Sequence, residues 1–195
     1  MSNRPTFNVA TALTWFRIAA IPAVAAVFYM PGEWSRPLSC LIFSIAGFTD
    51  LLDGYLARRL GQTSKFGAFL DPVADKLMVA ISLVIVVEAD TGRTPLVALI
   101  AAIIIGREIA VSALREWMAE IGARARVAVS PIGKAKTTMQ MIGLGCMLYR
   151  HDLWGIPVYQ VGFGLLIVAA AITLWSMLDY IRAAWPELTE REPVS

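Results

Sequence analysis

Residues 50–75 read DLLDGYLARRLGQTSKFGAFLDPVAD and place four aspartates inside segments that are otherwise largely apolar. Asp50 and Asp53 are three residues apart, and Asp71 and Asp75 are four apart, so each pair lies on one face of a helix. The link between the two pairs is short, which favours antiparallel neighbouring helices whose aspartates approach the same end of a bundle. We therefore expect the four carboxylates to converge on one pocket.

The composition of the chain fits a protein that lies in lipid. Of its 195 residues, 57% are hydrophobic and 16% are charged, against about 45–50% and about 25% in ordinary soluble domains. Mean hydropathy is +0.64. These values exclude a disordered chain, a disulfide-dense secreted module and a typical soluble enzyme. The net charge of +2 gives no basic surface for nucleic acid, and the length predicts a single domain over residues 1–195.

Six apolar segments are long enough to cross a bilayer, which takes about 20 residues of helix. They are Ala12–Met30, Leu38–Leu60, Phe69–Ala89, Pro95–Ala119, Ile132–Tyr149 and Ile156–Ile181. The first segment has an alternative as a signal peptide, since Ala23-Val24-Ala25 is similar to a cleavage site. However, Arg17 interrupts this segment and further apolar segments follow it. The sequence therefore predicts an all-α membrane protein with six transmembrane helices.

The cationic residues predict the orientation in the membrane. The links after the first, third and fifth segments hold Arg36, Arg93 and Arg150, three of the 17 lysines and arginines. The other cationic residues lie at the termini, in the remaining links or in the helix parts near them. Because lysine and arginine concentrate on the cytoplasmic side, we expect a multi-pass protein of the cell (inner) membrane whose termini and aspartate pocket face the cytoplasm.

Four carboxylates at membrane depth need a counter-charge. An ionisable group there costs from about 2.5 to more than 10 kcal/mol, and four acids without neutralisation would repel one another. Oxygen ligands suit Mg2+ or Mn2+, and the single histidine, His151, gives no indication of zinc. Two cations about 3.5–4 Å apart would form a site for phosphoryl transfer. The alternative is that the aspartates are helix caps and surface ion pairs, and Asp71 before Pro72 has the pattern of a cap.

Small and basic residues complete the pattern around the aspartates. Gly54, Ala57 and Gly67 leave room for a helix backbone or a substrate to come close, with ordinary helix packing as the alternative. Arg58 can hold a phosphate through a forked pair of hydrogen bonds. The eight fixed positions within residues 50–75 resemble the signature of the CDP-alcohol phosphatidyltransferases.

This resemblance implies a fold, a reaction and roles for individual residues. It implies six membrane helices, a homodimer and two divalent ions (Mg2+ or Mn2+) per active site. It also implies transfer of a substituted phosphate from a CDP-linked lipid to an alcohol, with CMP as the leaving group. By the family pattern the metal ligands are Asp50, Asp53, Asp71 and Asp75, and Asp75 is also the catalytic proton acceptor. The residues expected to bind the CDP-lipid are Gly54, Ala57, Arg58, Ser64, Gly67 and Thr14. The chain departs from the family at Ala10-Thr11, where a Pro-Asn pair is usual, which weakens the assignment of Thr14.

A second group of charges lies in the later segments. Arg107 and Arg115 are eight residues apart on roughly one helix face, and Lys134 and Lys136 open the next segment. Since the metals already offset the diphosphate of the donor, these four cations indicate a second anionic substrate whose phosphate they bind. The alternatives are ion pairs of the arginines with neighbouring glutamates and anchoring of the lysines at the membrane surface.

The later stretches narrow the resemblance to one branch of the family. Residues 106–108, 112–120, 127–130 and 133–140, with Leu13–Arg17 and Pro22, are similar to the bacterial phosphatidylglycerophosphate synthases. That similarity implies glycerol 3-phosphate as the acceptor and CDP-diacylglycerol as the donor. Another acceptor, such as serine or an inositol phosphate, is an alternative. So are a lipid-binding scaffold and a cation transporter, in which the carboxylates would line an ion pathway.

Overall fold

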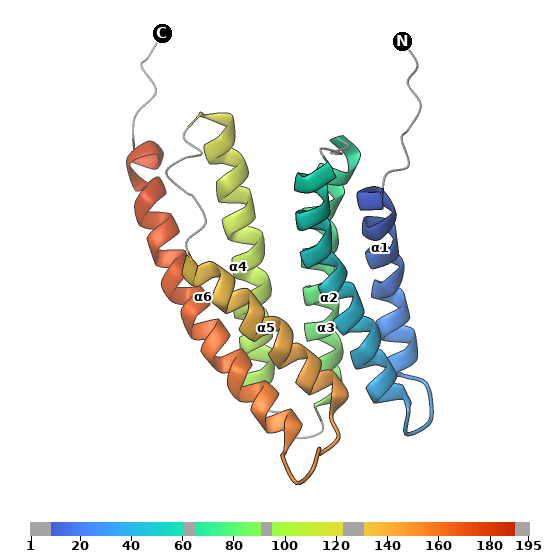
Figure 1. Ribbon diagram of the computed structural model, residues 1–195. Helices are drawn as coiled ribbons and strands as arrows, with labels where there is room; N and C mark the ends of the chain where they lie inside the picture. The colour runs from blue at the N-terminus through green and yellow to red at the C-terminus, as the bar shows by residue number, and fades with distance from the viewer. Residues whose placement is uncertain (1–8, 61–64, 91–94, 123–130, 190–195) are drawn as a thin grey trace.

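The computed structural model describes residues 9–60, 65–90, 95–122 and 131–189, and within them the side chains of residues 12–49, 70–90, 95–122 and 135–185. Apart from one isolated β-bridge, the regular structure of this part of the chain consists of six α-helices (Figure 1). They are α1 (Val9–Phe28), α2 (Ser35–Leu60), α3 (Lys65–Ala89), α4 (Pro95–Glu120), α5 (Pro131–Tyr149) and α6 (Val158–Thr189).

Each helix coincides with one of the six apolar segments, which confirms the prediction of an all-helical fold. The turns between them hold residues that suit a change of direction. Gly32, between α1 and α2, has a φ of 128°, and Gly155, between α5 and α6, has a φ of 81°. Residues with a Cβ rarely adopt these values, so glycine is the residue that closes both turns without strain.

The start of α3 differs from the predicted one and changes the interpretation of Asp71. The helix begins at Lys65, four residues before the predicted Phe69, so Asp71 is its seventh residue. The interpretation of Asp71 as a helix cap is therefore wrong, because a cap precedes the first turn. Pro72 lies inside the helix, beyond the first turn where proline is usually tolerated.

The six helices pack as a bundle with one end shared by the aspartate-bearing segments. α1 packs against α2 and α3, α4 contacts α3 and α6, and α5 packs most extensively against α6 while also contacting α2 and α3. Figure 1 shows the start of α1, the end of α2, the start of α3 and the ends of α4 and α6 at the same end of the bundle. We call this the aspartate end.

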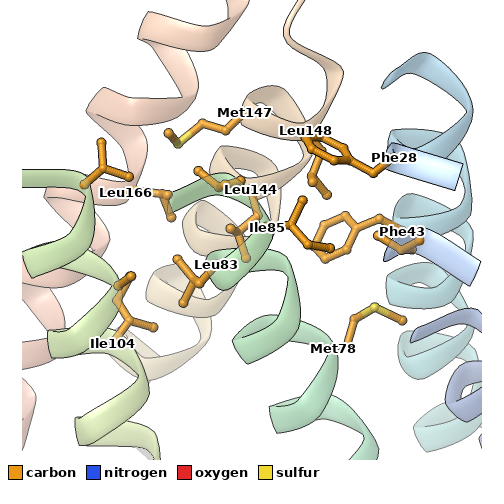
Figure 2. Close-up of a cluster of buried hydrophobic side chains, with 14 of the residues drawn as sticks. Phe28, Phe43, Met78, Leu83, Ile85, Ile104, Leu144, Met147, Leu148 and Leu166 are labelled. Atoms are coloured by element: carbon orange, nitrogen blue, oxygen red, sulfur yellow. The ribbon is translucent and has the colours of Figure 1, made fainter. Parts of the chain in front are cut away.

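Buried hydrophobic side chains from every helix form the main core (Figure 2). Phe28, Phe43, Leu83, Ile104 and Leu144 are each 1% exposed or less. In a lipid environment such contacts stabilise the bundle through van der Waals packing, since lipid chains are as apolar as the side chains. This core holds the helices that carry the charged residues in a defined register.

The crossing of α5 and α6 depends on two glycines. A Cβ placed on Gly162 would lie 2.7 Å from the carbonyl oxygen of Gly143 and 2.7 Å from Cβ of Cys146. A Cβ placed on Gly143 would lie 3.0 Å from the carbonyl oxygen of Gly162. The two backbones therefore approach as small residues allow in membrane helices. This close approach fixes how α6 is placed beside α5.

Within the described residues, two helices are long and apolar enough to cross a membrane, namely α4 over Pro95–Glu120 and α6 over Val158–Trp185. Only 28% of the apolar window of each is buried inside the bundle, whereas the core helix of a soluble protein would be mostly buried. Large apolar side chains such as Leu99, Ile109, Trp175 and Leu178 are at least half exposed on these helices. The outer surface of the bundle is thus suited to lipid.

Candidate active site

The two aspartate pairs lie at similar distances from the link that joins the end of α2 to the start of α3. Asp50 lies ten residues before the end of α2, and Asp75 lies ten residues after the start of α3. Asp53 and Asp71 lie seven and six residues from the same ends. At a rise of about 1.5 Å per residue, one aspartate of each pair is about 15 Å from the link and the other about 10 Å. The backbone is consistent with convergence, while the side chains of Asp50 and Asp53 lie outside the described part.

Helix α1 supplies a hydrogen-bond partner to Asp71 and to Asp75, the two aspartates of the predicted site whose side chains are described. Thr14 Oγ1 donates a hydrogen bond to Asp71 Oδ1 at 2.5 Å, and Arg17 Nη1 donates to Asp75 Oδ1 at 2.7 Å. Thr14 and Arg17 are each 1% exposed. Because they lie one turn apart on α1, as the aspartates do on α3, one face of α1 matches one face of α3. Thr14 is therefore placed against a predicted metal ligand.

The contact between Arg17 and Asp75 was not predicted from the sequence. A buried guanidinium is costly unless it is paired, so Asp75 explains why an arginine is tolerated inside an apolar helix. The available signal is the arginine within an apolar run, since such residues face the bundle interior and usually have a named partner. That feature identifies Arg17 as a site residue but not which acid it meets.

Asp75 lines one end of a cavity of about 630 Å³. The carboxylate side chain is 42% exposed, so it remains accessible despite its contact with Arg17. Thr137 and Thr138 of α5 line the cavity beside it. Arg17 also lines the cavity, and the rest of the wall comes mainly from small and apolar side chains: Cys40, Phe43, Ser44, Ala46, Gly47, Phe48, Met78, Val79, Met141, Ile142, Gly145, Cys146, Tyr149, Leu153 and Val158. We call the part of the wall formed by Asp75, Thr137 and Thr138 the polar end of this largely apolar cavity, whose size is typical of a ligand site.

The acids of α2 and α3 form a donor set that suits a hard divalent cation. Carboxylate oxygens are the ligands that Mg2+ and Mn2+ prefer, and Asp71 and Asp75 share one face of α3, with Asp75 lining the cavity. Among the described side chains no group of three histidines, cysteines, aspartates or glutamates could hold a metal. Asp50 and Asp53, the other predicted ligands, are outside that set. The four-aspartate metal site therefore stays a prediction with which the donor chemistry agrees.

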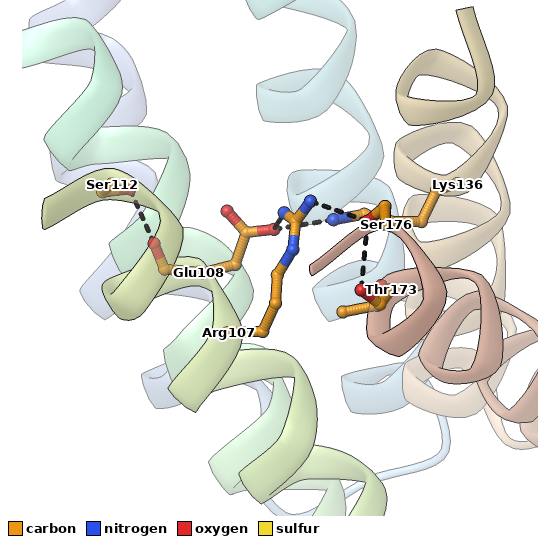
Figure 3. Close-up of polar contacts among 6 residues, drawn as sticks. All are labelled: Arg107, Glu108, Ser112, Lys136, Thr173 and Ser176. Atoms are coloured by element: carbon orange, nitrogen blue, oxygen red, sulfur yellow. Dashed lines mark hydrogen bonds and ion pairs between the residues drawn. The ribbon is translucent and has the colours of Figure 1, made fainter. Parts of the chain in front are cut away.

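A second charged cluster joins α4 and α5 around Glu108 (Figure 3). Glu108 Oε1 accepts hydrogen bonds from Arg107 Nη1 and from Lys136 Nζ, each at 2.9 Å. Arg107 is 9% exposed and Lys136 is 2% exposed. Anchoring at the membrane surface is therefore wrong for Lys136, because its ammonium is buried. The alternative of an ion pair with a neighbouring glutamate holds for Arg107.

Helix α6 adds two residues to this cluster, Ser176 and Tyr180, that were not predicted from the sequence. Arg107 Nη2 donates a hydrogen bond to Ser176 Oγ at 3.1 Å, as Figure 3 shows. The ring of Tyr180 lies near both predicted arginines, with its centroid 5.8 Å from Cζ of Arg107 and 5.6 Å from Cζ of Arg115. Thr173, Ser176 and Tyr180 recur at spacings of three and four, which is a polar stripe on an otherwise apolar helix. That stripe is the signal from which they could have been predicted.

Arg115 differs from Arg107 in its partner. Among the described residues it forms no ion pair, so the alternative of pairing with Glu116 or Glu120 is not met. Arg107, Arg115 and Lys136 are thus brought into one region by α4, α5 and α6. The side chain of Lys134 lies outside the described part.

The remaining predicted CDP-lipid residues also lie outside the described side chains. Gly54, Ala57 and Arg58 are in α2 and Gly67 is in α3, where the backbone alone is described. Ser64 lies between the two helices, outside the described residues.

The start of α5 connects the two charged regions. Lys136 reaches Glu108 and the cation cluster, whereas the next two residues, Thr137 and Thr138, line the cavity together with Asp75. The carboxylate of Asp75 at the cavity and the cation cluster on α4 and α5 are therefore linked by three consecutive residues of α5.

Comparison with known proteins gives one consistent result. The model of the family described as CDP-alcohol phosphatidyltransferase matches residues 7–175. The chain is 52% identical over 185 residues to proteins from Salmonella choleraesuis (strain SC-B67), Shigella flexneri serotype 5b (strain 8401) and Escherichia coli (strain K12). Each alignment covers 95% of this chain and 99% of the relative. All three relatives are named CDP-diacylglycerol--glycerol-3-phosphate 3-phosphatidyltransferase.

Proposed function

The chain belongs to the CDP-alcohol phosphatidyltransferase family, and we propose that it transfers the phosphatidyl group of CDP-diacylglycerol to glycerol 3-phosphate, giving phosphatidylglycerophosphate and CMP. The structural observation that supports this reaction best is the position of Asp75. Its carboxylate lies at the polar end of an apolar cavity, and the cation cluster begins on the same helix turn that lines this end. A lipid donor and a phosphorylated acceptor both have a complementary surface there.

The donor binds with its lipid part in the cavity and its nucleotide toward the aspartates. The apolar wall between α2, α3 and α5 suits an acyl chain, and the polar end suits the diphosphate. Gly54, Ala57, Arg58, Ser64 and Gly67 form the proposed site for the CDP moiety. Arg58 supplies the forked hydrogen bonds to phosphate, and the small residues allow close approach.

Divalent cations complete the donor site, and we infer two Mg2+ or Mn2+ ions held by Asp50, Asp53, Asp71 and Asp75. When bound, they would offset the charge of the diphosphate and of the departing CMP. Thr14 orients Asp71 through its hydrogen bond, and Arg17 orients Asp75. These two residues of α1 thus set the geometry of the ligands.

The chemical step uses Asp75 as the general base. Its carboxylate accepts the proton of the primary hydroxyl of glycerol 3-phosphate while that oxygen attacks the phosphorus attached to the lipid. A new phosphorus–oxygen bond forms, the bond between the two phosphates of the donor breaks, and CMP leaves with the electron pair. Positioning of the two substrates and electrostatic stabilisation supply most of the acceleration.

The acceptor phosphate binds to the cations of α4 and α5, namely Arg107, Arg115, Lys134 and Lys136. Glu108 offsets part of the charge of Arg107 and Lys136 and fixes both side chains through its carboxylate. Charge-assisted hydrogen bonds from guanidinium and ammonium groups suit a phosphate dianion. Serine has a carboxylate beside a positively charged amino group and lacks the dianionic phosphate that this cluster suits best.

The whole chain acts as one catalytic domain in the cell (inner) membrane. We propose that all six helices cross the bilayer, with both termini and the aspartate end in the cytoplasm, and that two copies form a homodimer. The shared position of the start of α1 and the end of α6 supports an even number of crossings. The exposed apolar side chains on α1 and α2 as well as on α4 and α6 support contact with lipid.

An acceptor panel tests the proposal. Purified protein in detergent, with CDP-diacylglycerol and Mg2+, should release CMP with glycerol 3-phosphate and not with serine or an inositol phosphate. Equal or greater release with either of the other acceptors would assign another alcohol to the site. No CMP release with any acceptor, from protein that is folded and supplied with Mg2+ or Mn2+, would favour a lipid-binding scaffold or a transporter.

A further inference from the structure

Tyr180 of α6 lies beside two guanidinium groups at once. Its ring centroid is 5.8 Å from Cζ of Arg107 and 5.6 Å from Cζ of Arg115, both within the range of a cation–π interaction. The arginines come from two turns of α4 and have the same charge, so bringing both to one ring costs repulsion. A ring that attracts both cations offsets part of this cost.

The two arginines are held in different ways by the rest of the cluster. Arg107 has a carboxylate partner in Glu108 and a hydroxyl partner in Ser176. Arg115 has no ion pair among the described residues, and the ring of Tyr180 is its recorded partner. The position of Arg115 therefore depends on Tyr180 more than that of any other described cation in the cluster.

An aromatic ring has one advantage over a carboxylate as a partner for Arg115. A carboxylate would neutralise the guanidinium and occupy its hydrogen-bond donors. A ring attracts the cation through its negative face and leaves its charge and donors available to an anion. Tyr180 is itself held in place, because it packs with Met118 and Ala184 in a small buried cluster at this end of α4 and α6.

We propose that Tyr180 is a positioning residue for the acceptor phosphate: its ring holds Arg107 and Arg115 side by side with the charge of Arg115 uncancelled. The inference rests on the proposed function, since it assigns the residue to the acceptor half of that site. It makes the last helix a determinant of acceptor affinity, and it gives Tyr180 no role toward CDP-diacylglycerol.

Two substitutions of Tyr180 distinguish the contribution of its ring from those of its hydroxyl group and of its apolar packing. Tyr180→Leu keeps an apolar side chain but removes the ring, and Tyr180→Phe keeps the ring. We expect the KM for glycerol 3-phosphate to rise by about tenfold in the Leu variant, as the loss of two cation–π contacts implies, and to change less than about twofold in the Phe variant. The KM for CDP-diacylglycerol should stay within about twofold in both, because neither contact involves the cavity.

Trp175→Leu is the matched control, since Trp175 is an aromatic residue of the same helix that is 66% exposed. It should leave both KM values unchanged. If Tyr180→Leu does not fold, Tyr180→Met gives the same comparison with a flexible apolar side chain.

An unchanged KM for glycerol 3-phosphate in the Leu or Met variant would overturn the inference. So would equal defects in the Phe and Leu variants, which would assign the effect to the hydroxyl, or equal changes in both substrates, which would indicate a merely structural role. Failure of the proposed function is a different result: the unsubstituted protein would then release no CMP in response to glycerol 3-phosphate.

Discussion

The acids of α3 and the cations of α4 and α5 are held in opposite ways. Asp75 forms an ion pair with Arg17, Asp71 accepts a hydrogen bond from Thr14, and Asp75 remains accessible from the cavity. Among the described residues, Arg107 and Lys136 share the carboxylate of Glu108, and Arg115 lies nearby against the ring of Tyr180 with no ion pair. The acid region thus offers carboxylates to a cation, and the cation region offers guanidinium and ammonium groups to an anion.

This contrast explains how one small bundle can bind two anionic substrates at two separate regions. The acid region attracts cations and holds a diphosphate only together with them, whereas the cation region binds a phosphate directly. Damage to one region should therefore change the use of one substrate or the chemical step, and leave the other substrate's affinity in place.

The largest effect is expected in the acid region, for Asp75→Asn. Loss of the general base should lower the rate of CMP release by about 10²–10⁴-fold, while the protein still folds. The measurement is steady-state CMP release with a thermal unfolding curve as a check. Glu88→Gln is a matched control, because Glu88 accepts a hydrogen bond from Tyr29 at the opposite end of the bundle. Near-normal turnover in Asp75→Asn would end the assignment of the base.

In the cation region, Arg115→Ala should raise the KM for glycerol 3-phosphate by about 10–100-fold, because a hydrogen bond to a charged group contributes about 1.5–3 kcal/mol. The KM for CDP-diacylglycerol should change little. Arg182→Ala provides the control, since Arg182 is an exposed arginine of α6 near the same end. Equal loss of affinity for both substrates would show that the two regions do not divide the substrates.

The sequence predicted the helices that carry the charged residues, but not the partners that those charges meet. Long apolar segments predicted all six helices, and the spacings of three and four put the aspartates on helix faces, because both depend on local pattern. The partners of those charges depend on tertiary packing. Arg17 meets Asp75 across 58 positions, and Arg107 meets Ser176 across 69, and no local pattern encodes which residues meet.

The boundary of α3 shows the same limit on a smaller scale. Asp71 before Pro72 has the local pattern of a helix cap, yet the helix extends six residues further toward its start. Packing of α1 against α3, with Thr14 donating to Asp71, uses that carboxylate in a tertiary contact. Tertiary context thus overrides a local propensity at a position assigned to the site.

The next prediction concerns the close crossing of α5 and α6, which places α6 beside the cation region. Gly162→Ala introduces a methyl group 2.7 Å from a backbone carbonyl oxygen, which has to move. Such overpacking costs about 1–3 kcal/mol, so we expect the midpoint of thermal unfolding to fall by several degrees. Gly164→Ala is the matched control, because a Cβ there meets nothing within 4 Å. The same midpoint for both variants would contradict the close crossing.

The smallest effect is expected for Thr14→Val, which removes one hydrogen bond to Asp71. A neutral donor contributes about 0.5–1.5 kcal/mol, so the Mg2+ concentration for half-maximal activity should rise by about fivefold. Thr14→Ser keeps the hydroxyl and should behave like the unsubstituted protein. If Thr14→Val changed the KM for glycerol 3-phosphate and left the Mg2+ dependence unaltered, the assignment of Thr14 to the acid region would be wrong.

The most direct test of the division into two regions is a crystal structure of the protein soaked with Mn2+ and glycerol 3-phosphate, with anomalous differences recorded to locate the metal. We predict metal peaks at the carboxylates of Asp71 and Asp75, and the phosphate of the acceptor within hydrogen-bond distance of Arg107 or Arg115. A phosphate bound at the aspartates, with the arginines of α4 unoccupied, would contradict the account.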